Sequence, residues 1–232
     1  MKAQHTGTPR RETLHVPRKS AKGALPEHDQ DSDPPRTAVP PSNPQGARPG
    51  SQPISKWPSE SREAAQLVID QYGEPDEATE TQLVWHRRGP WKRIVATKTF
   101  FKHDFPAPHI DAVESVIDYR VPVEKFTALA EFDGSVVVKR TAGEVSARCH
   151  DEQANFLALN LMHDIVTGAK SVKEARDYYA KEFADYRRKQ PTPYMERLRF
   201  TLGDANTADS DSRLLSDAEL EKAAEEGRRR SK

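Results

Sequence analysis

The sequence of 232 residues has a single cysteine, Cys149, and no aromatic residue before Trp57. One cysteine excludes an intrachain disulfide and the paired cysteines of zinc fingers. Residues 1–58 also hold 11 of the 18 prolines. A segment of this composition cannot bury enough apolar surface to offset the entropy of ordering its chain. We therefore predict that residues 1–56 form a disordered, proline-rich tail.

Several other features are missing. Met1 is followed by polar and basic residues without an apolar core, so no secretory signal is expected. The longest apolar stretch, around Phe156–Met162, is far shorter than the roughly 20 residues of a membrane span. Glycine-rich phosphate loops, Gly-x-Ser-x-Gly elbows and His-Glu-x-x-His helices are absent, which argues against the commonest enzyme classes. We predict a cytoplasmic protein without a membrane span.

The net charge is zero, but the charges are unevenly distributed. Residues 1–56 carry nine basic and five acidic residues, and residues 190–232 carry eight and nine. Residues 57–189 between them carry 19 basic and 22 acidic residues. A mildly acidic central region lacks the positive surface that grips a phosphate backbone, so nucleic acid is an unlikely partner.

Residues 57–133 show alternating helix and strand patterns. Apolar residues recur with helical spacing over 59–72, where Ser59 is the expected cap and Gly73 the expected end. Strand-forming residues dominate 81–101 on both sides of a turn at 87–90, which indicates a β-hairpin. Two prolines make 103–109 a loop. Residues 112–121 fit a helix or a strand, and we favour a strand. A helix should follow Pro122 and end at Asp133-Gly134.

The second half repeats the alternation. A second hairpin is expected over 135–149, followed by a strongly apolar helix that Asp151 caps and Gly168 ends. Ser171 and Glu174 form a capping box for a further helix. We predict an α+β domain over 57–190, with an antiparallel sheet of four to five strands and three to four helices. Residues 191–232 are predicted to be a mostly disordered tail with a possible short helix at 217–227.

The densest group of reactive side chains lies on two connected stretches. Histidines six residues apart on a proline-stiffened loop can share a zinc or iron ion, with a thiolate or carboxylate completing the ligand set. The candidate ligands are His103, Asp104, His109, Asp111, Cys149 and His150. No known metal spacing is matched, so the alternative is that these residues only end strands and cap a helix or loop.

Three further sets of polar or reactive side chains are candidates for a functional role. The tip of the first hairpin is basic and could bind an anion, although such tips are usually only solvated; its cations are Arg87, Arg88, Lys92 and Arg93. Cys149 is more typical of a small core residue than of a nucleophile. The apolar helix also carries polar residues that can line a pocket or form internal hydrogen bonds, namely Asn155, Asn160, His163 and Asp164.

Residues 132–141, 143–149 and 155–168, together with His103-Asp104-Phe105-Pro106, resemble a family of small uncharacterised bacterial proteins. The likeness spans about Trp57 to Tyr186 and leaves out both ends of the chain. It implies a bacterial, single-domain protein. It implies no activity, cofactor or catalytic residue.

Two functional hypotheses follow from the sequence. The first is a non-enzymatic binding or interaction module with a protein partner, because no catalytic set is recognisable and a disordered tail suits recruitment. The second is a metal-binding protein or metal-dependent enzyme built on the loop between His103 and His109, near Cys149 and His150.

Overall fold

The computed structural model describes residues 51–203 and 206–231. The predicted N-terminal tail therefore lies outside the described residues as far as position 50. The described chain begins with α1 (Ser51–Ile54), before the boundary predicted at Trp57. Ile54 and Trp57 are both buried in the hydrophobic core.

The centre of the fold is a six-stranded antiparallel sheet with the order β1-β2-β3-β4-β6-β5. Its strands are β1 (Glu77–Ala78), β2 (Gln82–Arg88), β3 (Trp91–His103), β4 (His109–Asp118), β5 (Val136–Lys139) and β6 (Glu144–Cys149). Both predicted hairpins are confirmed, and the strand predicted over 112–121 is present but runs from His109 to Asp118. The sheet exceeds the predicted four to five strands because β1 pairs with the edge of the first hairpin.

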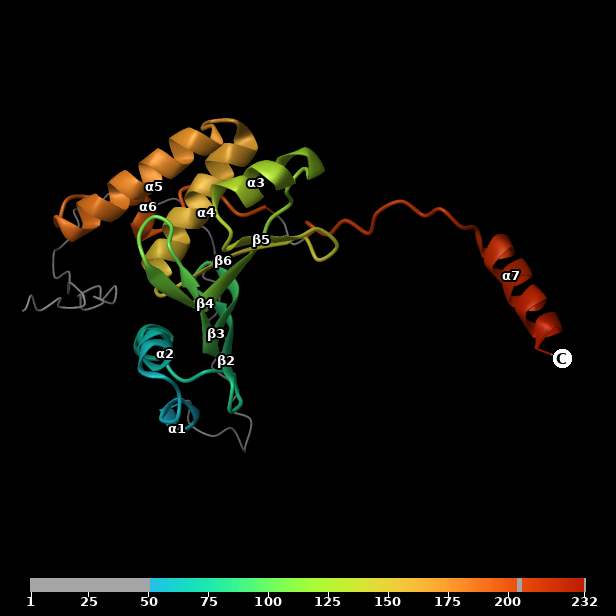
Figure 1. The fold of residues 1–232 in the computed structure, drawn as a ribbon, viewed down its shortest axis with the longest axis horizontal. Coiled ribbons are helices and arrows are strands. Elements are labelled where there is room, and N and C mark those ends of the chain that lie inside the picture. The colour runs from blue at the N-terminus through green and yellow to red at the C-terminus, as the bar shows by residue number, and fades with distance from the viewer. Residues whose placement is uncertain (1–50, 204–205, 232) are drawn as a thin grey trace, which may run out of the picture.

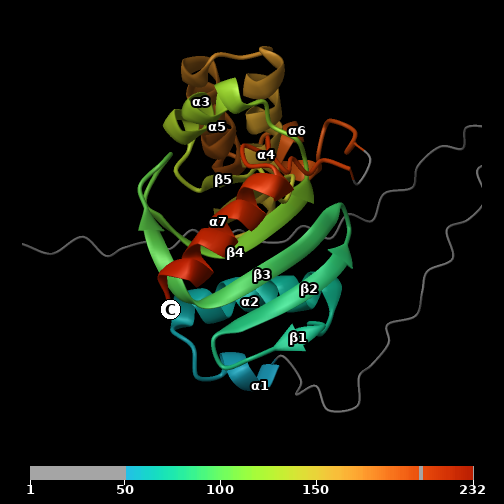
Figure 2. The ribbon, with the colours of Figure 1, turned by 90° about the vertical axis from the view of Figure 1, so that its right-hand side faces the viewer.

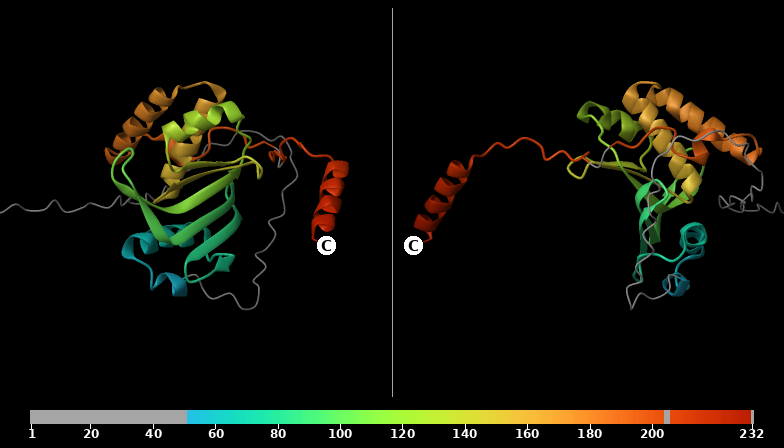
Figure 3. Two further views of the ribbon diagram at one scale, coloured as in Figure 1. Left: turned by 45° about the vertical axis from the view of Figure 1, so that its right-hand side comes forward. Right: turned by 180° about the vertical axis from the view of Figure 1, so that it is seen from behind.

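Helices cover one face of this sheet (Figures 1 and 3). α2 (Ser59–Tyr72) lies across the end formed by β3 and β4, and it ends as predicted at Gly73, whose φ is +78°. Ser59 does not cap it, because Pro58 occupies the cap position and the Ser59 hydroxyl donates to Glu60 instead. The Trp57 indole donates to the Glu80 carbonyl, which fastens the start of α2 to the sheet.

The other end of the sheet is covered by a helical layer built on α4 (Glu152–Thr167). The Asp151 side chain accepts a hydrogen bond from the Ala154 amide at 2.9 Å, so the predicted cap is confirmed. Ten residues of α4 are buried, as expected of a helix that is apolar nearly all round. A 3-10 turn (Val123–Lys125) and α3 (Phe126–Phe132) precede it.

The layer continues with α5 (Val172–Arg187), which begins with the predicted capping box of Ser171 and Glu174. α6 (Pro193–Glu196) packs on α4 and buries Met195. The Asn160 amide of α4 donates to the Tyr194 and Arg197 carbonyls at 2.9 and 2.8 Å, which holds the chain after α6 in place. The described chain thus has more helices than the predicted three to four.

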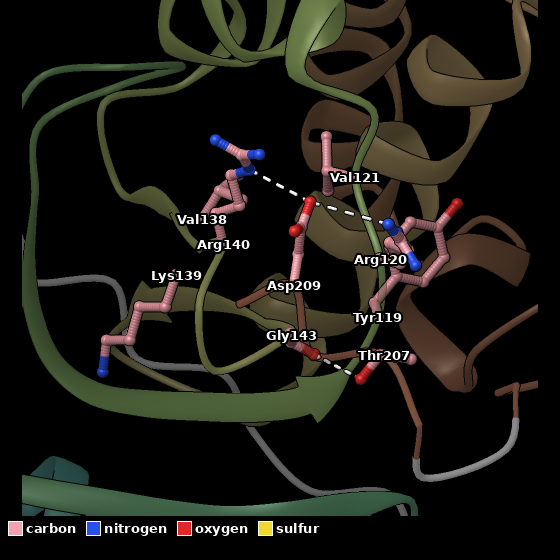
Figure 4. A pocket seen from close by; sticks show the side chains of 9 residues that line it. All are labelled: Tyr119, Arg120, Val121, Val138, Lys139, Arg140, Gly143, Thr207 and Asp209. Atoms are coloured by element: carbon pink, nitrogen blue, oxygen red, sulfur yellow. Dashed lines mark hydrogen bonds and ion pairs between the residues drawn. The ribbon is translucent and has the colours of Figure 1, made fainter. Parts of the chain in front are cut away.

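A C-terminal segment folds back onto the turn between β5 and β6. The Thr207 hydroxyl donates to the Gly143 carbonyl at 2.7 Å, and Asp209 lies between Arg140 and Arg120, with nitrogen–oxygen distances of 3.1 and 3.5 Å (Figure 4). The hollow enclosed here has a volume of about 10 Å³, no more than one water molecule needs. α7 (Asp217–Arg230) follows as a fully exposed helix in front of the open face of the sheet (Figure 2).

Within the described residues, no helix is long and apolar enough to cross a lipid bilayer.

Candidate metal centre

The sheet brings two histidines and an aspartate together where β3 passes into β4. His103 is the last residue of β3 and His109 the first of β4, and the two are paired across the antiparallel ladder. Asp111 lies two residues further along β4, so its side chain is on the same face as that of His109. One ligand atom from each residue lies within 4.8 Å of the others. Among the described residues, this is the one such group.

The distances within the group are those of metal ligands. His103 Nδ1 lies 3.5 Å from Asp111 Oδ2, and His109 Nε2 lies 3.3 Å from Asp111 Oδ1. Two ligands at about 2.0–2.1 Å from a zinc ion are about 3.3 Å apart on the corners of a tetrahedron. Each histidine therefore stands about as far from the Asp111 carboxylate as two ligands of one ion stand from each other.

A backbone carbonyl fixes the orientation of His109. Nδ1 of this ring lies 2.8 Å from the Ala107 carbonyl oxygen, which can only accept a hydrogen bond. Nδ1 must therefore carry the proton, and in the neutral ring Nε2 presents a lone pair. That lone pair faces Asp111 Oδ1, a buried carboxylate oxygen without a hydrogen bond. Two acceptors facing each other at 3.3 Å require a proton or a metal ion between them.

The electrostatics of the group favour charged forms. Burial raises the pKa of Asp111, but the neighbouring His103 and His109 rings and the Ser135 hydroxyl outweigh burial and lower it to about 2. The pKa of His103 is raised, chiefly by the neighbouring Asp111 carboxylate, although burial opposes the shift. Asp111 is therefore ionised at neutral pH, the state that a metal ligand needs.

Two residues that were not predicted support the group from outside. Asp133, just after α3, places Oδ1 3.7 Å from His103 Nε2 and accepts the Ser135 amide at 2.8 Å. The Ser135 hydroxyl donates to Asp111 Oδ2 and lies 3.3 Å from His103 Nδ1. Asp133-Gly134 was interpreted only as the end of a helix, and Ser135 as the start of the second hairpin. The position of these residues opposite the loop between His103 and His109 depends on the pairing of β5 with β6, which local patterns do not reveal.

The other predicted ligands lie outside this group. Asp104 is exposed on the loop. Cys149 and His150 are buried at the end of β6, and burial raises the pKa of the Cys149 thiol well above its ordinary value. A buried thiol held protonated fits a core residue better than a nucleophile.

The cations of the first hairpin are engaged with carboxylates. Arg88 pairs with Asp76 at 2.8 Å, and Arg93 forms a two-pronged pair with Glu144 at 2.7 and 2.6 Å. Lys92 lies between Asp118 and Glu144. These pairs neutralise three of the four cations considered for anion binding, namely Arg88, Lys92 and Arg93, while Arg87 is exposed.

The polar residues of α4 serve the packing of the fold. The Asn155 amide donates to the Val113 carbonyl and the Ser115 hydroxyl, at 3.1 and 3.0 Å. His163 Nδ1 lies 2.8 Å from the Tyr119 hydroxyl. The Asp164 carboxylate accepts hydrogen bonds from Lys170 and Tyr194. The Asn160 amide donates to the Tyr194 and Arg197 carbonyls. Each of these side chains thus makes at least one hydrogen bond within the fold, although the Asn155 Oδ1 atom is buried without a partner.

A groove of about 1040 Å³ opens between α2 and the layer of α4, α5 and α6, and His109 lines one part of it. Its floor is formed by strand residues, including Ile94 and Val113, and its walls are rich in aromatic side chains: Tyr72, Phe156, Tyr179, Phe183 and Tyr186. Glu152 also lines it and accepts hydrogen bonds from Tyr72 and from the Trp91 indole, the latter at 2.6 Å. The candidate metal centre therefore borders this groove.

Comparison of the chain with models of known protein families, with curated proteins and with solved structures found no match. The resemblance to small bacterial proteins therefore stays a prediction.

Proposed function

We propose that this domain binds a divalent transition-metal ion through His103, His109 and Asp111. The observation that carries the proposal is the convergence of three ligand atoms, with His109 Nε2 3.3 Å from the buried Asp111 Oδ1 and His103 Nδ1 3.5 Å from Oδ2 of the same carboxylate. Two imidazoles and one carboxylate are the ligands of non-haem iron(II) sites and also suit zinc. We therefore infer zinc(II) or iron(II) as the ion.

The number of ligands bears on the kind of site. A structural zinc site is closed by four protein ligands, whereas a site with three keeps a position open for water or a substrate. Within the described residues, three side chains form the group, and one of them lines a groove of the size that small organic ligands occupy. These features favour an open centre, which polarises a bound water or carbonyl when the metal is present.

Metal analysis of the purified full chain tests this proposal. We expect one zinc or iron per chain, or one equivalent of cobalt(II) taken up by chelator-treated protein. His109→Ala should abolish this binding. His86→Ala is the matched control, because His86 is half exposed at the other end of the sheet, where it pairs with Glu77. Metal-free protein that takes up no zinc, iron or cobalt would refute the proposal, as would equal loss in both variants.

A second candidate function is the binding of an organic molecule in the groove, without catalysis. The observation that favours it is the volume of about 1040 Å³ beside aromatic walls. A fragment screen by two-dimensional NMR on the full chain tests it. We expect the amide shifts of Leu67, Phe183 and Met195 to move together. Shifts confined to other surfaces would contradict this function.

A further inference from the structure

We infer that Asp133 is a positioning residue that makes His103 bind the metal through Nδ1, while His109 binds through Nε2. This inference rests on the proposed metal site but adds the atom used by each ring and a residue outside the ligand set. It follows from the acceptor that faces the second nitrogen of each ring. A proton held on one nitrogen leaves the other as the ligand atom.

The two rings are held differently. His109 has the Ala107 carbonyl at its Nδ1, so its free lone pair is on Nε2. In His103 the arrangement is reversed, since Nε2 faces the Asp133 carboxylate at an ion-pair distance of 3.7 Å, while Nδ1 lies 3.5 Å from Asp111 and 3.3 Å from the Ser135 hydroxyl. Both remaining lone pairs are then directed at the carboxylate of Asp111. The ring centroids lie 4.8 Å apart, so the two rings stand in contact beside that carboxylate.

Asp133 is itself built into the fold. It is 4% exposed, and the Ser135 amide donates to the same oxygen that faces His103. Burial raises its pKa, and the nearby His103 opposes that shift. A buried carboxylate beside a ligating imidazole is the usual partner that orients the ring and strengthens its bond to the metal. Asp133 thus has the position and the chemistry of such a partner without being a ligand.

The test compares Asp133→Ala and Asp133→Asn with the exposed control Asp104→Asn in the full chain. Asparagine keeps an acceptor for the Ser135 amide and for His103 but removes the charge, so it carries the test even if the alanine variant does not fold. We expect cobalt(II) affinity to fall about 10- to 100-fold in the Asp133 variants and to stay unchanged in Asp104→Asn. The stoichiometry should remain one ion per chain at saturation.

Nitrogen-15 NMR of the histidine rings identifies the ligand atoms directly. Zinc-loaded protein should show His103 bound through Nδ1 and His109 through Nε2. In metal-free protein at high pH, His103 should carry its proton on Nε2, and Asp133→Ala should give a mixture of both tautomers. Binding of His103 through Nε2, or a tautomer that does not respond to Asp133, would overturn the inference. The metal-free measurement decides this even if the wild-type chain binds no metal, which would refute only the proposed function.

Discussion

Replacing Asp111 with asparagine should destabilise the metal-free protein in a pH-dependent way. The carboxyl pKa falls from 3.8 to about 2 in the folded state. A shift of about 1.8 units corresponds to ~2.4 kcal/mol, at 1.36 kcal/mol per unit. Asp111 is 3% exposed, so solvent screening does not remove this contribution. We therefore expect Asp111→Asn to lose about 2 kcal/mol of unfolding free energy at pH 6.

The sign of the pH dependence follows from the direction of each shift. A lowered carboxyl pKa contributes stability above pH 3.8, and this contribution is lost as the pH falls towards about 2. The raised His103 pKa acts in the opposite sense, since its contribution is complete below pH 6.5 and disappears as the pH rises through the folded value. The metal-free group should therefore stabilise the fold most between these two limits.

Urea denaturation of the wild type and Asp111→Asn at pH 6 and pH 2.5, in the presence of a chelator, measures the effect. The difference between the proteins should shrink from about 2 to below 1 kcal/mol at the lower pH. Ser210→Ala, on the C-terminal segment, is a control in which no pH-dependent difference is expected. A difference for Asp111→Asn that is equal at both pH values would refute the assigned ion pairs, because it would reflect packing alone.

Three further predictions concern the scaffold. Gly143→Ala should lower the unfolding free energy by about 1–3 kcal/mol and speed proteolysis of 206–216, because φ is +64° and a Cβ would lie 2.2 Å from the Thr207 carbonyl carbon. Leu161→Ala, in the core of α4, should cost about 2–5 kcal/mol by urea titration, whereas Leu220→Ala on the exposed α7 should cost less than about 0.5. Glu144→Gln should cost about 2–3 kcal/mol at pH 7, because it leaves Arg93 and Lys92 without their shared carboxylate, whose side chain is 9% exposed.

Periodicity predicted the elements well where one face of an element is apolar. The buried α4 and both hairpins have such faces, so their positions followed from local patterns. Contacts between segments far apart in the sequence could not be predicted from local patterns. Trp91 lies in sequence among the cations of the basic hairpin tip, but it is 1% exposed and stacks on Phe156 with ring centroids 4.7 Å apart. Its partner lies on a helix 65 residues later, and no local pattern identifies it.

The candidate site could be predicted only in part, because local patterns show residue types but not which strands pair. His103, His109 and Asp111 were singled out as a group by residue type, and the pairing of β3 with β4 brings them together. Cys149 and His150 were included because cysteine and histidine are common metal ligands, but at the end of β6 they lie outside the group. Starting β4 at His109 instead of residue 112 would have shown that His109 and Asp111 share a face.

The rigidity of the connection between His103 and His109 explains why a site can exist at this position. The five residues between the paired histidines form a tight loop, and Phe105 packs there against Tyr179 with ring centroids 5.1 Å apart. Arg176 of α5 lies 3.8 Å above the Phe105 ring and donates to the Phe132 carbonyl at 2.5 Å. The loop is thus fixed to α5 and to the end of α3, next to Asp133. Candidate ligands that are held on two strands and supported by these contacts keep their geometry without an ion, so little ordering entropy would oppose the proposed metal binding.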